Sequence, residues 1–370
     1  MGRNKSCRTG GKKFSVVRYA RWSTVEGDHG YNTPKQASGY NSTNKYYCTT
    51  FVIFESHYKI LKCKESVFMR VDEIKNVLIV GSGTMGQQIG FQCALYDCNV
   101  VLYDIKKEML EKAMERINRI ASRMTREGRI THEKAAEAIS RIRTTVDMAQ
   151  AAKDADIVSE SVPEDPELKG RVFGQLNALC PERTIFTTNT STLLPSMIAQ
   201  ATGRPEKFLA YHFHDIRMTN VVDVMPHPGT SPEFVELVKE FAERTGLAPI
   251  VLHKESVGYV FNYMFSGLFE SALTLASNDI ASVEDIDRVW MGIMHMLIGP
   301  FGLMDSVGLD TVWYVNNFWA KNTGDPVKVK NTEFIKKYVD RGELGQKTRK
   351  GFYTYPHPAF TSPDFLKGIK

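Results

Sequence analysis

A short segment near residue 80 places the strongest constraint on the fold. Residues 76–80 are an apolar run rich in valine and isoleucine, which is typical of a strand buried on both faces. The run leads into a G-x-G-x-x-G turn formed by Gly81, Gly83 and Gly86, and the helix and strand patterns that follow end at Asp104. This order is the dinucleotide-binding fingerprint in its required context. It predicts a Rossmann-type domain.

Each residue type in the turn has a physical reason to be there. Gly81 permits the tight turn, Gly83 lets the backbone approach a pyrophosphate, and Gly86 lets the helix pack close to the strand. The helix begins near Thr84 and Met85, where free N–H groups and the positive end of the helix dipole face the phosphates. We therefore expect the turn to bind the pyrophosphate of a dinucleotide.

Asp104 indicates which dinucleotide is bound. It lies 18 residues after the last glycine of the turn, where a carboxylate accepts hydrogen bonds from the ribose hydroxyls. The same negative charge repels a 2′-phosphate. The sequence therefore predicts NAD rather than NADP.

Charge and cysteine content exclude several other classes. The net charge of +5 is uneven, because residues 1–68 carry +8 and residues 69–370 carry −3, so nucleic-acid binding is not inferred. No window approaches the roughly 20 apolar residues of a transmembrane helix, and no membrane partner is expected. The six cysteines form no metal-type pairs and suit a reducing compartment, so we predict a cytoplasmic protein without a metal.

The first 68 residues differ from the rest and leave three interpretations open. Seven basic residues up to Arg21, with no acid before Glu26, fit a mitochondrial transit peptide, which would place the protein in the matrix if residues 1–25 act as one. Residues 1–6 also match the N-myristoylation pattern. The third and preferred interpretation is a disordered or artefactually translated leader, since Met69 lies directly before the first strand pattern.

The remaining chain predicts two domains of different architecture. Strand patterns follow the first two at residues 143–146, 156–160, 184–188, 208–213, 221–225 and 248–252, and helical patterns lie at 106–141 (broken at 126–129), 148–153, 163–179, 194–201 and 232–245. This alternation predicts a doubly wound, mostly parallel sheet over residues 69–254. Residues 255–370 predict an all-helical domain with helices at 259–277, 283–294, 302–319 and 331–341. Its many apolar side chains leave open a closed helical core or a homodimer face.

Two residues on predicted neighbouring strands are candidates for the reacting groups. Oxidation of an alcohol by NAD requires a base, and a histidine oriented by a carboxylate is well suited to this role. His212 and Asp223 could meet through the sheet. The alternative is a buried histidine that only hydrogen-bonds within the core.

Several motifs along residues 74–355 resemble the 3-hydroxyacyl-CoA dehydrogenase family, also called 3-hydroxybutyryl-CoA dehydrogenases. The matching segments are 81–86 (GSGTMG), 160–169, 189–191 (NTS), 211–213 (YHF), 257–262 (VGYVFN), 299–310 (GPFGLMDSVGLD) and 345–353 (GQKTRKGFY). The resemblance covers both predicted domains in order. It implies a Rossmann domain, a helical domain that forms dimers, and an NAD-dependent oxidation.

The resemblance also implies roles for single residues. Glu164 and Lys169 would lie near the cofactor, and Ser191, which has a cofactor contact as well, would hold the substrate hydroxyl. His212 would be the general base, paired with Asp223. Asn262 would lie in the active site. In the implied mechanism His212 takes the hydroxyl proton, Asp223 stabilises the imidazolium, and the hydride passes to the nicotinamide.

The sequence departs from the family pattern around the base. The family motif HFFNP becomes HFHDI, so His214 and Asp215 are new. The acid that pairs with the base is Asp223 rather than a glutamate, and it lies one residue nearer to the base along the chain than in the family. His214 is a rival for the base or a second imidazole that tunes the first. Arg217 is either an anchor for a substrate carboxylate or phosphate, or a solvated cation.

The helical hairpin carries a further group of cations. Arg123, Arg126 and Arg129 surround Gly128, and in the family this hairpin closes over coenzyme A. The arginines could bind its 3′-phosphate, or they form a charged turn that faces solvent.

We therefore predict NAD-dependent oxidation of an L-3-hydroxyacyl-CoA, of the short-chain 3-hydroxybutyryl-CoA type, or the reverse reaction. One alternative is a dehydrogenase of the same fold that acts on a free hydroxy acid such as gulonate or carnitine. The other is a non-catalytic, crystallin-like protein that binds NADH.

Overall fold

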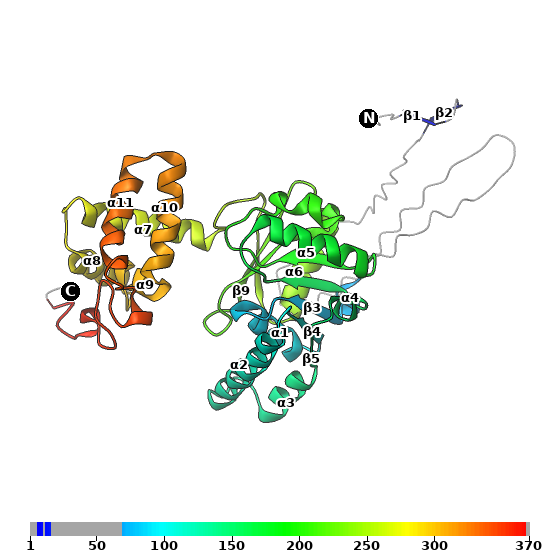
Figure 1. The fold of residues 1–370 in the computed structure, drawn as a ribbon, viewed down its shortest axis with the longest axis horizontal. Helices are drawn as coiled ribbons and strands as arrows, with labels where there is room; N and C mark the ends of the chain where they lie inside the picture. The colour runs from blue at the N-terminus through cyan, green and yellow to red at the C-terminus, as the bar shows by residue number, and fades with distance from the viewer. Residues whose placement is uncertain (1–5, 10–11, 16–68, 368–370) are drawn as a thin grey trace, which may run out of the picture. The chain divides into compact units, whose positions relative to one another are not determined.

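The computed structural model describes residues 6–9, 12–15 and 69–367. The chain divides into two units, residues 1–68 and 69–370 (Figure 1). In the first unit, strand β1 (Ser6–Thr9) pairs antiparallel with β2 (Lys12–Ser15). The three interpretations of residues 1–68 concern mainly the rest of this segment, which lies outside the residues that the structure describes.

The second unit is organised around an eight-stranded sheet. The strands are β3 (Asn76–Val80), β4 (Asn99–Tyr103), β5 (Ile142–Thr145), β6 (Ile157–Glu160), β7 (Ile185–Thr188), β8 (Phe208–Phe213), β9 (Val221–Pro226) and β10 (Ala248–Val251). Their order is β10-β9-β8-β7-β6-β3-β4-β5, and every pair is parallel except β8 with β9. The prediction of a mostly parallel, doubly wound sheet is confirmed. The order of the strands reverses between β3 and β6. Sheets of this kind bind ligands at such a point, in the crevice beyond the carboxyl ends of the strands.

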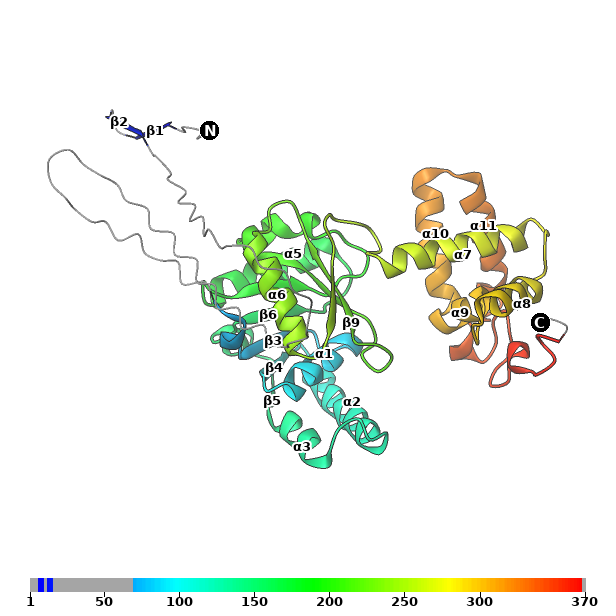
Figure 2. The same cartoon turned by 180° about the vertical axis from the view of Figure 1, so that it is seen from behind.

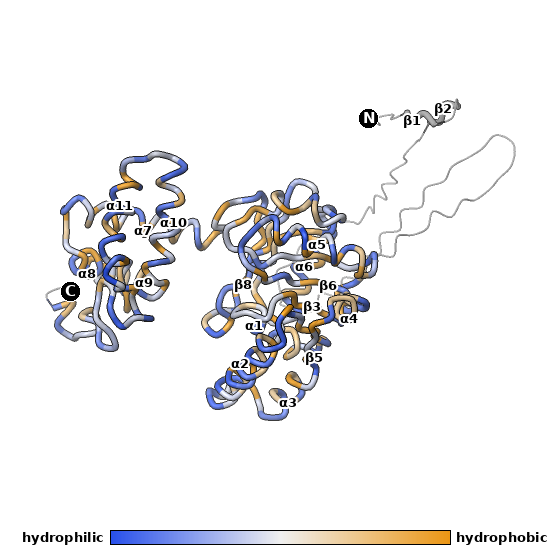
Figure 3. The backbone as a smooth tube through the Cα atoms, in the orientation of Figure 1, coloured by the Kyte–Doolittle hydropathy of each residue, from blue (hydrophilic) through white to orange (hydrophobic). Residues whose placement is uncertain are grey.

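Helices cover both faces of the sheet, because successive strand residues point to opposite faces. The helices are α1 (Thr84–Leu95), α2 (Lys107–Arg126), α3 (His132–Ser140), α4 (Met148–Ala152), α5 (Pro166–Leu179) and α6 (Pro232–Arg244). Ile79 faces a core shared with α1, α2, α3 and α6, whereas Leu78 and Val80 face a second core shared with α4 and α5. Figure 2 shows α6 from the opposite side. Hydrophobic and hydrophilic residues alternate along α2 in Figure 3, as expected for a helix with one buried face.

The rest of the second unit is helical, as predicted, but with one break that the sequence reading missed. The helices are α7 (Phe261–Ser277), α8 (Val283–Met294), α9 (Pro300–Val307), α10 (Leu309–Thr323) and α11 (Pro326–Val339). The single helix predicted over residues 302–319 is wrong. Gly308 has φ +101°, a conformation that ends α9 and starts α10 in a new direction.

Some predicted boundaries also differ from the structure. The predicted helix at 194–201 is two short 3₁₀ turns, α5 begins at Pro166 after the N-cap Asp165, and α11 begins at Pro326 after the N-cap Asp325. A proline at the first helical position removes no intrahelical hydrogen bond, which explains both starts. The 3₁₀ turns are Val71–Glu73, Pro195–Met197, Ala199–Thr202, Pro205–Lys207, Gln346–Thr348 and Ala359–Thr361.

Two buried carboxylates connect the motif segments 299–310 and 345–353 of the helical region. Asp287 accepts hydrogen bonds from the N–H groups of Phe301 (2.8 Å) and Gly302 (3.0 Å) and from the Tyr353 hydroxyl (2.9 Å). Burial raises the pKa of Asp287 to about 6. Asp305 accepts from the N–H of Tyr353 at 2.9 Å. The segments around residues 300 and 352 are therefore held together by these two carboxylates.

No helix among residues 6–9, 12–15 and 69–367 is both long and apolar enough to cross a membrane.

Candidate active site

The glycine turn between β3 and α1 has the geometry that a dinucleotide needs. Gly81 adopts φ +98°, and a side chain there would collide with the Ser161 carbonyl at 2.7 Å. A side chain on Gly86 would lie 1.9 Å from the Gly81 carbonyl, so α1 packs against the turn only because this residue is glycine. Gly83, in contrast, has open space where a Cβ would be, and it is the N-cap of α1. A phosphate group can therefore approach the turn and the first helical residues, Thr84 and Met85.

Asp104 stands beside this turn at the end of β4. Its carboxylate accepts hydrogen bonds from the Ser82 N–H (3.0 Å) and hydroxyl (2.8 Å), and from the Lys106 N–H (3.1 Å). The contacts hold the carboxylate next to the pyrophosphate turn, and the side chain remains half-buried. The position fits recognition of the ribose hydroxyls of NAD.

Cofactor choice offers a direct test of Asp104. Asp104→Asn keeps the shape but removes the charge, so we expect about a tenfold or greater rise in KM for NAD, since hydrogen bonds to charged groups contribute about 1.5–3 kcal/mol. The preference for NAD over NADP should fall at the same time. Steady-state kinetics with both cofactors measures this, with the exposed Asp154→Asn as the matched control. An unchanged NAD/NADP ratio would contradict the assignment.

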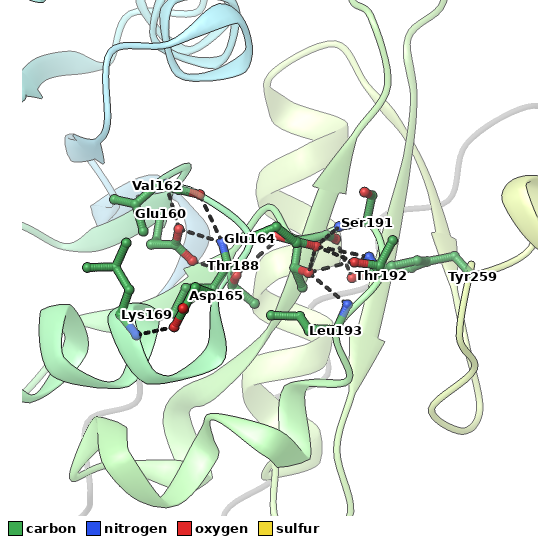
Figure 4. A network of polar contacts seen from close by, with 12 residues as sticks. Glu160, Val162, Glu164, Asp165, Lys169, Thr188, Ser191, Thr192, Leu193 and Tyr259 are labelled. Carbon is green, nitrogen blue, oxygen red and sulfur yellow. Dashed lines mark hydrogen bonds and ion pairs between the residues drawn. The ribbon is translucent and has the colours of Figure 1, made fainter. Parts of the chain in front are cut away.

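A buried ion-pair network lies on the opposite side of the switch point, after β6 (Figure 4). The Lys169 ammonium is 2.7 Å from Glu160 and 3.3 Å from Glu164, and Lys169 and Glu160 are almost fully buried. Glu160 also accepts hydrogen bonds from the Val162 N–H (2.6 Å) and the Thr188 hydroxyl (2.7 Å). Burial raises the pKa of Glu160 despite these donors.

Glu164 connects this ion-pair network to the loop after β7 through hydrogen bonds. Its carboxylate accepts hydrogen bonds from the Thr190 hydroxyl, from the N–H groups of Ser191 and Thr192 (3.1 Å each), and from the Thr192 hydroxyl (2.8 Å). Burial alone would raise the pKa of Glu164, but these donors and Lys169 outweigh it and lower the pKa. Glu164 and Lys169 therefore position the loop that contains Ser191.

His212 and Asp223 meet as expected from the sequence. They are directly opposed in the antiparallel ladder of β8 and β9, and His212 Nδ1 is 3.0 Å from Asp223 Oδ2. Both side chains are nearly fully buried. The shorter acid and the one-residue deletion therefore still permit contact.

His214 contacts the same carboxylate, because it lies on the same side of the chain as His212. Its Nε2 is 3.2 Å from Asp223 Oδ2, and its ring centroid is 4.7 Å from that of His212. Burial by itself would raise the pKa of Asp223, but the hydrogen bonds from both histidines outweigh it and lower the pKa. An ionised carboxylate only accepts, so both imidazoles direct an N–H towards it. Nε2 of His212 is then the nitrogen left to accept a proton.

Arg217 is not a free cation in the structure. Its guanidinium forms a fork with Asp215, with Nε 2.8 Å from Oδ1 and 3.1 Å from Oδ2. The backbone N–H of Arg217 also donates to Asp215. Hydrogen bonding by Arg217 lowers the pKa of Asp215. Asp215 thus holds the guanidinium that was considered as a substrate anchor.

The arginines of the α2–α3 hairpin have different environments. Arg123 pairs with Glu127 at 2.6 Å, and Arg129 lies 3.9 Å from the same carboxylate. Arg129 also lines a cavity of about 190 Å³ together with Lys134. Arg126 is exposed at the last position of α2. Glu127 therefore neutralises part of the charge proposed for a coenzyme A phosphate.

Tyr259 is a site residue that sequence reasoning missed. Its hydroxyl donates to the Thr190 carbonyl at 2.6 Å, and its ring stacks on His212 with centroids 4.7 Å apart. The available signal was its place in the VGYVFN segment, three residues before Asn262. Asn262 is half-buried in the first turn of α7, and within residues 69–367 its side chain makes no hydrogen bond. The structure thus brings Tyr259 into contact with the base.

These features are those of a nicotinamide-dependent dehydrogenase. Residues 76–256 match the model of the 3-hydroxyacyl-CoA dehydrogenase NAD-binding domain, and residues 258–355 match the C-terminal domain of the same family. The chain therefore belongs to the 3-hydroxyacyl-CoA dehydrogenase family, and its cofactor is NAD.

Individual relatives agree with this assignment. The mitochondrial hydroxyacyl-coenzyme A dehydrogenase of Rattus norvegicus is 31% identical over 288 residues, which are 76% of this chain and 91% of the relative. The structure of (S)-3-hydroxybutyryl-CoA dehydrogenase from Ralstonia eutropha matches with a TM-score of 0.71 and 29% identity over 77% of this chain and all of that one. A diketoreductase structure, described as acting on dicarbonyl compounds, matches with a TM-score of 0.70 and 39% identity over 76% of this chain and 99% of that one.

Proposed function

We propose that this chain oxidises an L-3-hydroxyacyl-CoA to the 3-ketoacyl-CoA, or catalyses the reverse reaction, with short-chain 3-hydroxybutyryl-CoA as its substrate. The observation that carries the proposal is the His212–Asp223 pair, which lies in an NAD-binding sheet at the position of the family's base. NAD, when bound, supplies the acceptor for the hydride that leaves the substrate carbon.

The proton chemistry follows from the tautomer of His212. The Nδ1–H donates to Asp223, so Nε2 has a lone pair that accepts the proton of the substrate hydroxyl. The imidazolium that forms is stabilised by the Asp223 carboxylate 3.0 Å away. Tyr259, stacked on the ring, limits its rotation and excludes water from one face.

Other residues position the reactants in this proposal. Ser191 holds the substrate oxygen from a loop that Glu164 fixes, and Asn262 reaches the same oxygen from the start of α7. Gly81, Gly83, Gly86 and Asp104 bind NAD. Arg126 and Arg129 contact the phosphates of coenzyme A.

A second candidate function is reduction or oxidation of a free oxo or hydroxy compound without coenzyme A. The diketoreductase structure favours it, because its 39% identity exceeds the 29% identity of the hydroxybutyryl-CoA enzyme over nearly the same span. The HFHDI segment and the arginine after it support this function as well, because His214, Asp215 and Arg217 change the polarity next to the base.

Substrate competition decides between the two. NADH oxidation by the full-length protein should be measured with acetoacetyl-CoA and free acetoacetate side by side, and with a 1,3-diketone as a third substrate. We expect turnover on the thioester. Turnover on the free compounds alone would favour the second function, and tight NADH binding without turnover on any of them would favour the non-catalytic, crystallin-like protein.

We also propose that the helical domain forms a homodimer. Its apolar exposed side chains include Phe261, Tyr263, Met264, Ile280, Val289, Ile293, Met294, Leu297, Tyr314 and Phe318. A second copy of the domain would cover such exposed apolar side chains. Sedimentation equilibrium should give twice the chain mass of 41.8 kDa, and a mass of one chain would contradict the proposal.

The proposal divides the chain into the extension 1–68, an NAD-binding domain at 69–254 and a helical domain at 255–370 that borders the substrate cleft. It places the protein in the cytoplasm, which the free thiols of Cys93, Cys98 and Cys180 support. The alternative, the mitochondrial matrix, depends on residues 1–25.

A further inference from the structure

A cluster of metal-ligating side chains coincides with the base. His212, His214 and Asp223 each offer a ligand atom, and these three atoms all lie within 4.8 Å of one another. Two of the residues are buried, and His214 is half-buried, with 17% of its side chain exposed. The expectation of no metal rested on the spacing of the cysteines and did not consider these three residues together.

We propose that this cluster is an inhibitory zinc site, at which one Zn²⁺ binds His212 Nδ1, His214 Nε2 and an oxygen of Asp223. Two imidazoles and one carboxylate form a common three-residue zinc set, with a water as the fourth ligand. The exposed side of His214 gives the ion and that water access.

The distances support this coordination. Zinc bonds of about 2.0–2.2 Å in a tetrahedron place neighbouring ligand atoms about 3.3 Å apart. Asp223 Oδ2 is 3.0 Å from one ring nitrogen and 3.2 Å from the other. An ion bound to all three atoms would lie between them, about 2 Å from each, so that Oδ2 would keep nearly its present distance from both nitrogens.

Inhibition follows from the proton count of His212. A neutral imidazole has a single N–H, and in the metal-free site it is on Nδ1, which donates to Asp223. A metal on Nδ1 displaces that proton, so Nε2 becomes the N–H nitrogen. Nε2 then has no lone pair for the substrate proton, and the base is blocked without any contact between metal and substrate.

His214 separates this site from the ordinary family chemistry. The proposed mechanism needs only His212 and Asp223, whereas zinc binding needs the third ligand, 3.2 Å from the carboxylate. His214→Asn therefore tests the metal site. Its matched control is His253→Asn, which changes an exposed histidine outside the cluster.

Direct binding is the first arm of the test and is independent of any activity. The full-length protein, freed of metal with EDTA and dialysed, is titrated with Zn²⁺ by isothermal titration calorimetry. We expect one saturable ion per chain, weakened at least about tenfold by His214→Asn and unchanged by His253→Asn, since even outer-shell partners of a metal site contribute 10–100-fold in affinity. Equal affinity in wild type and His214→Asn, or no saturable binding, would overturn the proposal.

Turnover is the second arm, and it uses whichever of the three substrates the competition experiment finds to be turned over. Zn²⁺ should abolish NADH oxidation, EDTA should restore it, and Mg²⁺ should have no effect, because magnesium prefers oxygen ligands. Inhibition is expressed relative to the rate of each variant without metal. Zinc bound in the calorimeter with unchanged turnover would overturn ligation through His212. If no substrate is turned over, the proposed function is contradicted. The calorimetric titration still tests the metal site, because it does not depend on activity.

Discussion

Replacing His212 by alanine should lower kcat by about 10²–10⁴-fold, the contribution of a positioned general base. The reason is geometric, since Asp223 holds Nδ1 at 3.0 Å and Tyr259 stacks on the ring, so that Nε2 is presented for proton transfer. KM should change much less than kcat. Stopped-flow or steady-state NADH oxidation measures the loss, and circular dichroism verifies that the variant is folded.

The matched control is His214→Ala, which removes the other imidazole on the same carboxylate. We expect a loss of about tenfold or less, because Asp223 keeps its hydrogen bond from His212 and loses only one donor. The opposite pattern, near-normal turnover in His212→Ala and a large loss in His214→Ala, would assign the base to His214.

Replacing Lys169 by methionine should destabilise the protein by about 3–5 kcal/mol, because it leaves a buried carboxylate without its partner. Lys169 and Glu160 are 1% and 0% exposed, and their charges are 2.7 Å apart. The variant should also loosen the Ser191 loop, because Glu164 loses its ammonium, and KM for NAD should rise.

Urea unfolding provides the measurement and the controls. Lys107→Met breaks an exposed pair with Glu111 at 3.7 Å and should change the free energy of unfolding by about 0.5 kcal/mol or less. The double variant Lys169→Met with Glu160→Gln should recover part of the loss, because the fully buried side chain at position 160 then carries no charge. The burial argument fails if Lys169→Met is no more destabilising than Lys107→Met.

Local patterns in the sequence predicted much of the sheet. The strands at 76–80 and 208–213 and the helix at 283–294 have the predicted bounds, because apolar periodicity and turn residues are local signals. Helix ends were less predictable. Gly308 reads as an ordinary helical glycine until its φ of +101° is known, and that angle depends on how α9 and α10 pack.

Side-chain partners at the site were predictable only where a strand register or a motif linked them. His212 and Asp223 could be paired because two adjacent strands place them opposite each other. The fork between Arg217 and Asp215 could not, because it depends on how the chain turns after β8 and not on spacing. The contact of Tyr259 with His212 joins residues 47 positions apart in the chain and has no local signal.

The sequence by itself determined the class of this protein: the glycine turn and Asp104 require a dinucleotide site, and the motifs from 81 to 353 identify the family. These features are encoded by neighbouring residues, so they can be read without a fold. Only the tertiary structure decided that one carboxylate, Asp223, serves two imidazoles. That arrangement arises from the pairing of β8 with β9, which brings distant residues within hydrogen-bonding distance and thereby sets both the tautomer of His212 and the zinc site proposed here.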